Sequence, residues 1–268
     1  MKHPSYNSKD RNAIRNYYSN WNYDCQDIDL RFRGIKIMGL VRTIKKRKTK
    51  WHISWSWLQK TINKRRVNNN NIAIHLRQYI NTRRFPLRVF MTSVEFFDPR
   101  ALGKRRLGYP RILRSGIVSF EEDSSLQSSI HTALILSDVL KNMQHKFVFT
   151  GNKSIHVWVL DFKWEEWVPK KYLVRNYYKA HLREVSEYLA RKNFFEWVAE
   201  TSGVKNLDRS TTTDTRRVIP VLDTLNALTW RKVIELNRKE LELDDPNYIQ
   251  GVANVRSLIG DGLPRRAG

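Results

Sequence analysis

The amino-acid sequence predicts an α+β fold, and three observations carry this prediction. Residues 146–161 have the alternation and the central polar turn of a β-hairpin. Apolar residues recur at helical spacing in 11–22, 126–140 and 173–199. The 268 residues are 41% hydrophobic and 12% aromatic and show no internal repeat and no clear linker, so we expect one compact unit over residues 1–268.

The N-terminal part is predicted to contain a helix and two strands. Ile14, Tyr17, Tyr18 and Trp21 are spaced like one face of an amphipathic helix. Strand-like runs follow at 34–41 and 51–58, and six of the nine residues between them are Lys or Arg. We interpret this segment as a basic hairpin loop, either solvated or in contact with phosphates. Together with the VNNNN stretch before residue 72, it suggests a mobile basic insertion around residues 42–71.

The middle of the chain is predicted to form a helix from residue 72, a strand at 86–96, a turn-rich basic connection at 97–111 and a strand at 116–125. Alternation along the last strand places Glu121 and Asp123 on one face, roughly 6 to 7 Å apart. Two carboxylates at this separation repel each other unless a cation lies between them, which favours a divalent metal. The alternative is an acidic strand end before a helix, with serine and acidic residues as caps.

The hairpin at 146–161 follows the predicted helix at 126–140. Ile155, Val157 and Val159 alternate with His156 and Trp158, so His156 is expected beside the turn, on the face away from the β-branched row. Such a histidine either belongs to a site or is a satisfied histidine of an ordinary hairpin.

The C-terminal part is predicted to hold an aromatic loop, a long helix at 173–199, a short apolar strand, and a helix-like segment before a short Gly/Pro/Arg tail. Four tryptophans, at 55, 57, 164 and 167, are either interface anchors or core residues.

The charge balance indicates a polyanionic partner. Lys and Arg number 49 against 26 Asp and Glu, a formal net charge of +23. Nucleic acid is favoured over a membrane because the chain has no apolar span of crossing length and no amphipathic anchor. The single cysteine, Cys25, cannot form an internal disulfide or a thiolate zinc site, and no secretory signal is visible. We therefore expect an intracellular protein, of the cytoplasm or nucleoid.

Three stretches resemble, in order and spacing, the three motifs of the archaeal and eukaryotic type DNA primase small subunit. They are SFEED at 119–123, TGNKSIH at 150–156 and LDRSTTTDTRRVIPVLDTLNALT at 207–229. The family has a strand with Asp-x-Asp, a Ser-Gly-x-x-Gly-x-His hairpin, and an Asp followed by a basic strand that leads to Ser-Leu-His. Arg217 and Asn226 follow Asp208 by nine and eighteen residues, as in the family. Looser agreement upstream extends the resemblance over most of residues 12–230.

The resemblance implies a fold, an activity and a set of partners. The fold would be a central mixed or antiparallel sheet flanked by helices. The activity would be template-directed synthesis of short RNA primers by two-metal nucleotidyl transfer, with Mg²⁺ or Mn²⁺. The partners would be a primase large subunit, a single-stranded DNA template with its RNA primer, and nucleoside triphosphates, as in a primosome.

The resemblance also implies roles for individual residues. The catalytic, metal-binding carboxylates would be Glu121, Asp123 and Asp208. The nucleotide's phosphates would be bound by Thr150, Gly151, Asn152, Lys153, His156, Arg217 and Asn226. Amides of the turn at 150–154 could add donors, because such turns form anion-binding nests.

Departures from the family pattern mark a reduced or diverged member. Glu121, Thr150, Ser154, Pro220 and Asn226 replace the first Asp, the Ser, the second Gly, a basic residue and the last His. Only 27 residues separate Asp123 from Gly151, with no cysteine among them, so no zinc-binding insertion and no structural zinc are expected. Two alternatives therefore stand beside the primase: a catalytically impaired primase-fold subunit that binds nucleic acid or serves assembly, and an RNA-packing protein with coincidental motifs.

Overall fold

The strands of the chain form two four-stranded antiparallel sheets. The computed structural model describes residues 6–25, 27–45, 48–61, 67–102, 112–170 and 180–255. The first sheet has the order β2-β1-β3-β9, with β1 Ile35–Lys45, β2 Lys48–Trp57, β3 Arg84–Thr92 and β9 Val218–Pro220. The second has the order β12-β7-β8-β6, with β12 Ile234–Leu236, β7 His145–Phe149, β8 Ile155–Val159 and β6 Val118–Glu121. Two short pairs complete the described strands: β4 Glu95–Phe96 with β5 Ile112–Arg114, and β10 Leu225–Asn226 with β11 Arg231–Lys232.

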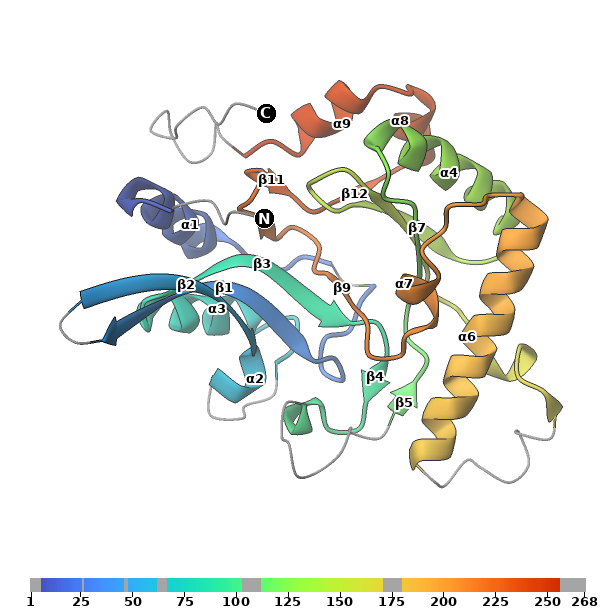
Figure 1. Cartoon of the computed structure of the whole chain (residues 1–268), viewed down its shortest axis with the longest axis horizontal. Coiled ribbons are helices and arrows are strands. Elements are labelled where there is room, and N and C mark those ends of the chain that lie inside the picture. Colours follow the sequence, from blue (N-terminus) through green and yellow to red (C-terminus); the bar gives the residue numbers. More distant parts are fainter. Residues whose placement is uncertain are drawn as a thin grey trace.

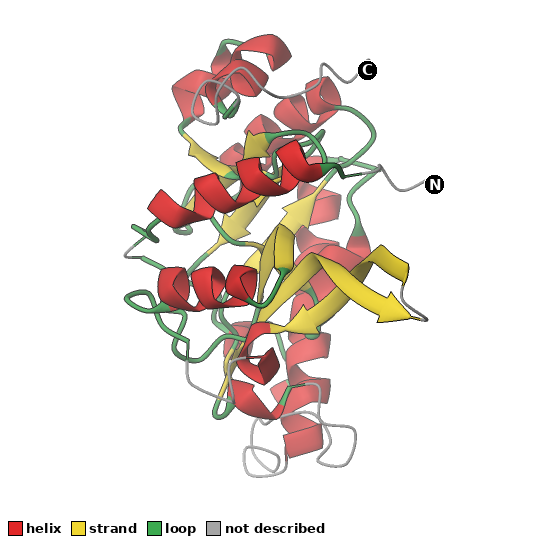
Figure 2. Ribbon diagram, turned by 90° about the vertical axis from the view of Figure 1, so that its left-hand side faces the viewer, coloured by secondary structure: helices red, strands yellow, loops and turns green. Residues whose placement is uncertain are grey.

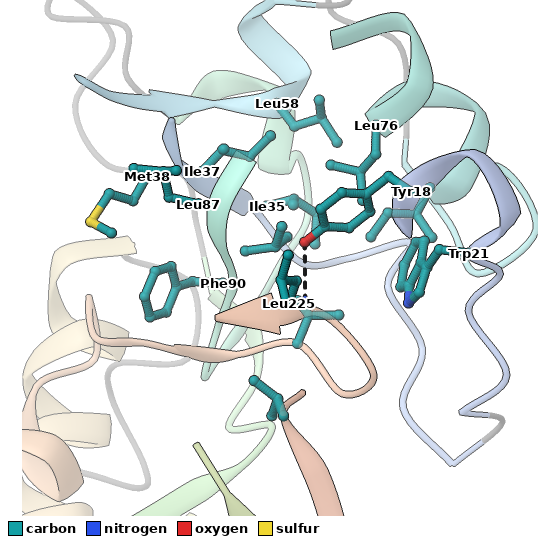
Figure 3. Packing of buried hydrophobic residues seen from close by; sticks show 14 of the residues in the cluster. Tyr18, Trp21, Ile35, Ile37, Met38, Leu58, Leu76, Leu87, Phe90 and Leu225 are labelled. Carbon is teal, nitrogen blue, oxygen red and sulfur yellow. Dashed lines mark hydrogen bonds between the residues drawn. The ribbon is translucent and has the colours of Figure 1, made fainter. Parts of the chain in front are cut away.

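Three helices accompany the first sheet: α1 Ser8–Asn20, α2 Leu58–Thr61 and α3 Ile72–Asn81. Asn7 and Asp10 form a capping box that fixes the start of α1. Ile14 and Tyr18 lie one turn apart and are fully buried, as the spacing predicts. The Tyr18 hydroxyl accepts a hydrogen bond from the Leu225 amide at 3.2 Å (Figure 3). Figure 2 shows α1 and α3 one above the other beside the strands. The helix predicted at 11–22 is confirmed and begins at Ser8.

The second sheet packs against α4 Leu126–Val139 and α6 Ala180–Ser202, on the opposite side of the molecule from α1 (Figure 1). Ser125 caps α4 by accepting from the Ser128 amide at 3.0 Å, so serine capping after the acidic strand end is confirmed. Short helices α7 Arg209–Thr213, α8 Arg238–Glu242 and α9 Pro246–Val252 and the 3₁₀ turns Pro99–Ala101 and Trp164–Glu166 complete the described elements.

The hairpin β7–β8 separates two hydrophobic clusters. Ile155, Val157 and Val159 pack in the cluster with α4 and α6, whereas Trp158 belongs to the cluster of the first sheet. The predicted division of this strand into two faces is therefore confirmed. Both faces are covered, and His156 is only 5% exposed although it borders a cleft.

Three sequence predictions need correction. The expected single central sheet is two sheets, because the two hydrophobic clusters are each built on one of them. The basic segment 42–50 is not mainly a loop, since β1 continues to Lys45 and β2 starts at Lys48. The strand predicted at 86–96 breaks at Ser93 and Val94, and β4 pairs separately with β5. Three predicted segments lie outside the described residues: 103–111, the start of the helix at 173, and the tail after 255. Among the described helices, none is long and apolar enough to span a membrane.

A buried arginine links α6 to β6 and to α7. Arg191 is fully buried and forms an ion pair with Glu187 at 2.9 Å. Its guanidinium also donates to the carbonyls of Ser115, Ile117 and Thr212, at 2.5, 3.2 and 3.4 Å. Because Ser115 and Ile117 precede β6 and Thr212 lies in α7, Arg191 joins the strand that ends at Glu121 to the helix that Asp208 caps.

Candidate active site

Glu121 and His156 face each other across two strands. Glu121 ends β6, and the register of β6 with β8 places it directly opposite His156. His156 Nε2 lies 3.2 Å from Glu121 Oε1, and the carboxylate has no proton to give at neutral pH, so the imidazole donates. His156 Nδ1 lies 3.1 Å from Ser119 Oγ. The fold thus provides this histidine with partners on both ring nitrogens.

Two hydroxyl groups complete the surroundings of Glu121. Ser154 Oγ donates to Oε1 at 3.0 Å, and Thr211 Oγ1 lies 3.1 Å from Oε2. Burial by itself raises the pKa of this carboxyl, but His156 and the hydroxyl donors outweigh burial and lower the pKa to about 2. Glu121 is therefore a carboxylate at every physiological pH.

Asp208 is tied directly to the end of β6. Its amide donates to the Glu121 carbonyl at 2.8 Å, and its side chain caps α7 by accepting from the Ser210 amide at 2.8 Å. Thr211 Oγ1 donates to Asp208 Oδ2 at 2.7 Å, so one hydroxyl bridges Asp208 and Glu121. Burial opposes ionisation of Asp208, yet the hydrogen bonds from Thr211 and Ser210 and the charge of Arg217 lower its pKa.

The threonine run in α7 explains this placement. Thr211 contacts both carboxylates, while Thr212 Oγ1 donates to the Ser119 carbonyl of β6 at 2.9 Å. Arg217 follows the run and lies 3.5 Å from Asp208 Oδ2 and 3.1 Å from Thr211 Oγ1. Its guanidinium is positioned by the same hydroxyl that joins the carboxylates.

The hairpin turn carries Lys153 toward the second acidic residue. Lys153 Nζ lies 3.7 Å from Asp123 Oδ2, and both side chains are about half exposed or more. Thr150 is buried, and its hydroxyl contacts the Ser154 carbonyl at 3.2 Å. Gly151 has φ of +77°, a conformation that favours glycine, and Asn152 faces the cleft.

Asn226 holds the hairpin turn by a hydrogen bond to its backbone. It is 1% exposed, donates to the Thr150 carbonyl at 3.3 Å and accepts from the Leu228 amide at 3.2 Å. Its side chain does not line the cleft. In this structure Asn226 positions the backbone at Thr150 and Gly151, and a direct contact with a nucleotide stays a prediction.

A cleft of about 470 Å³ lies between the two sheets. Glu121 and Asp123 line it, whereas Asp208 and Thr211 lie behind Glu121 and are not part of the lining. The second sheet contributes Glu121, Asp123, Thr150, Asn152, Lys153, Ser154 and His156 with their connecting turns, and the first sheet and the approach to β9 contribute Lys36, Trp55, Arg88, Phe90, Asp214, Arg216, Arg217, Val218 and Pro220. Five Lys or Arg side chains in this lining stand against three Asp or Glu, a balance that suits a polyanionic ligand.

Several side chains of this site were not predicted from the sequence. Thr211 and Ser154 were not predicted as partners of Glu121, because a hydroxyl gives no motif signal. Arg88 and Lys36 belong to strands that read as ordinary sheet, and the one signal for each is a single cation inside an apolar run. Burial lowers the pKa of Arg88, and the negative charge of Glu121 opposes this shift.

The structure brings together two of the three carboxylates that were expected to converge, and their binding of a metal stays a prediction. Glu121 and Asp208 share the Thr211 hydroxyl, whereas Asp123 lies beside Lys153. Within the described ranges no group of three or more His, Cys, Asp or Glu side chains is arranged to hold a metal ion.

Comparison with known proteins finds a likeness to this chain in its fold and not in its sequence. No family model matches the sequence, and no curated protein does. The solved polymerase domain of ligase D from Mycobacterium tuberculosis, in complex with DNA, matches with a TM-score of 0.50 at 10% identity. The match covers 97% of this chain and 99% of that domain. The α+β fold of antiparallel sheets and flanking helices is thus shared with a polymerase domain, and the likeness concerns the fold alone.

Proposed function

We propose that this chain is a nucleotidyltransferase of the primase type, the catalytic subunit of a DNA primase that makes short RNA primers on a template. One observation carries the proposal. The ionised Glu121 lines the cleft and shares one hydroxyl with the ionised Asp208 behind it, and the cations of Lys153, Arg217 and Arg88 line the same cleft as Glu121. Carboxylates beside cations are what transfer of a nucleotide from a triphosphate requires.

The donor set fits a hard divalent ion. Glu121 and Asp208 offer only oxygen, both are ionised at neutral pH, and the chain has one cysteine, so Mg²⁺ or Mn²⁺ suits it better than zinc. Mg²⁺ is commonly held by one or two carboxylates together with substrate phosphates, so Glu121 with Asp208 or Asp123 would suffice. When bound, two such ions would lower the pKa of a 3′-hydroxyl and neutralise the leaving pyrophosphate.

The chain's own residues would prepare the site before a ligand arrives. His156, Ser154 and Thr211 keep Glu121 ionised and in one orientation. Lys153 and Arg217 would exchange their ion pairs with Asp123 and Asp208 for contacts with the triphosphate. The amides of the 150–154 turn add donors beside them.

The proposed partners follow from charge and resemblance. The net charge of +23 and a fold shared with a domain crystallised with DNA support a nucleic-acid template with its primer. The resemblance of the motifs further supports a primase large subunit as partner and nucleoside triphosphates as substrates. We place the protein inside the cell, in the cytoplasm or nucleoid.

Incorporation of labelled nucleotides on a single-stranded template tests the proposal. We expect synthesis that needs Mg²⁺ or Mn²⁺ and falls by about a hundredfold or more in Asp208→Asn and Asp123→Asn. Asp138→Asn is the matched control, because that carboxylate lies on α4 outside the cleft and is 67% exposed. Full activity in Asp208→Asn would contradict the site.

A specific observation favours a second candidate, a primase-fold subunit that binds nucleic acid without catalysis. One oxygen of Glu121 already accepts from His156 and Ser154, and Asp123 is paired with Lys153. Under this alternative the purified chain, with its large subunit and either metal ion, would bind single-stranded DNA and incorporate no nucleotide.

A further inference from the structure

The wall of the cleft formed by the first sheet carries aromatic and cationic side chains on one face. Met38 of β1 is the register partner of both Trp55 of β2 and Arg88 of β3, and Lys36 is the partner of both Trp57 and Phe90. Register partners in a sheet project to the same side. Lys36, Trp55 and Arg88 therefore share the face that borders the cleft.

Each exposed or half-buried ring on this face has a cation close to it. Lys36 Nζ lies 5.1 Å from the ring centroid of Trp55, and the Arg11 guanidinium lies 4.6 Å from that of Trp51. Arg88 lies 4.8 Å from the ring of Phe90, which packs 5.5 Å from Trp55. Trp51 and Trp55 occupy the same side of edge strand β2, about 13 Å apart along the strand.

Trp55 is not a core residue. It is 51% exposed, the highest value among the tryptophans, whereas Trp164 is buried and Trp57 is half-buried. A tryptophan kept in solvent with a cation beside it does little for the core, so its placement needs another explanation.

We propose that this surface, defined by Trp51, Trp55, Arg11, Lys36 and Arg88 and here named the tryptophan face, stacks the bases of a single-stranded nucleic acid and leads the strand into the cleft. The proposal deepens the function proposed above, because that strand would be the template. Exposed rings with cations close to them suit a ligand that offers both bases and phosphates. A duplex would not fit, because its base faces are already stacked within the helix.

Fluorescence anisotropy with two labelled oligomers tests the proposal. One is an oligothymidylate, and the other has the same length and phosphates but abasic sugars. With neither nucleotide nor metal present, Trp55→Ala should weaken oligothymidylate binding by about 5- to 100-fold, the range expected for one stacked base, and leave abasic binding unchanged. Trp55→Phe should restore most of the affinity.

Trp197→Ala is the matched control, because Trp197 is 38% exposed on α6 and lies outside the cleft. It should bind both oligomers like the wild type. Equal weakening of both oligomers by Trp55→Ala, or no change in either, would overturn the proposal.

The test separates this inference from the proposed enzyme. Binding is measured in the Asp208→Asn background as well, so base-dependent loss in Trp55→Ala would support stacking even if the wild type incorporated no nucleotide. Conversely, normal incorporation by Trp55→Ala at limiting template would overturn stacking and leave the nucleotidyltransferase intact.

Discussion

The two walls of the cleft differ in how their charges are used. On the second-sheet side, every predicted site charge has a protein partner: Glu121 has His156, Asp208 has Arg217, and Asp123 has Lys153. On the first-sheet side, Lys36 and Arg88 contact aromatic rings, and the described part of the chain gives neither an ion pair. The side with Glu121, Asp123 and Asp208 is here called the paired wall. The part of the first sheet with Lys36 and Arg88 is called the open wall, and it does not include Arg216 and Arg217, which pair with Glu184 and Asp208.

This difference predicts which substitutions change stability and which change ligand binding. Removing one member of a buried pair leaves its partner desolvated and unpaired, which costs folding free energy. Removing an unpaired cation leaves no such partner. On the paired wall, substitution at the buried Glu121–His156 pair should therefore act mainly on stability, whereas substitution on the open wall should act mainly on ligand affinity.

The largest expected effect on stability comes from His156→Ala. Glu121 is 14% exposed and would keep only hydroxyl donors, so we expect the free energy of unfolding to fall by about 3 kcal/mol. Urea denaturation followed by circular dichroism measures it. His156→Gln retains a donor and should lose less, and a loss below about 1 kcal/mol in His156→Ala would show that the wall is not held by this pair.

A second prediction concerns pH. The folded pKa of Glu121, about 2, lies below its unfolded value, so its charge stabilises the fold above the unfolded pKa and this contribution fades as pH falls from about 4.5 toward 2. Wild type should exceed Glu121→Gln by about 2 to 3 kcal/mol at pH 7. The gap should narrow in unfolding experiments as pH decreases from 5 to 3.5. If the difference in unfolding free energy between wild type and Glu121→Gln did not change with pH, it would come from packing and not from charge.

Sequence patterns revealed the second wall far better than the first. The resemblance to the three primase motifs singled out Glu121, Asp208, Lys153 and Arg217, which lie in turns or next to the ends of elements. The pairing of Glu121 with His156 depends on the register of β6 with β8, which no local pattern encodes.

The first wall could not be predicted for a related reason. Arg88 reaches the cleft only because β3 pairs with β1 and the two sheets meet, and these contacts join residues far apart in the chain. The division into two sheets likewise depends on long-range pairing, such as β9 with β3. Strands and helices as such follow local periodicity, which is why most of them were predicted correctly.

A third and smaller effect is expected at the turn of the paired wall. Gly151→Ala places a side chain at φ of +77° and a Cβ 3.0 Å from that of Asn226, so unfolding free energy should fall by about 2 kcal/mol. Gly203→Ala is the matched control, with φ of +69° and open space around the new Cβ. Thermal denaturation of the two variants separates the effect of backbone strain from that of the contact with Asn226. Equal losses of unfolding free energy in both variants would mean that Asn226 does not constrain the turn.

The smallest effect on stability is expected for Arg88→Ala on the open wall. Burial lowers the pKa of Arg88, so folding gains little from its charge, and the free energy of unfolding should change by no more than about 0.5 kcal/mol. Affinity for a nucleoside triphosphate should nevertheless fall about tenfold, since a charge-assisted contact is lost. Equilibrium binding of a labelled triphosphate measures this, with Arg88→Lys as the variant that keeps the charge. A destabilisation of several kcal/mol with unchanged affinity would place Arg88 in a paired network like that of Glu121, and the contrast between the two walls would be lost.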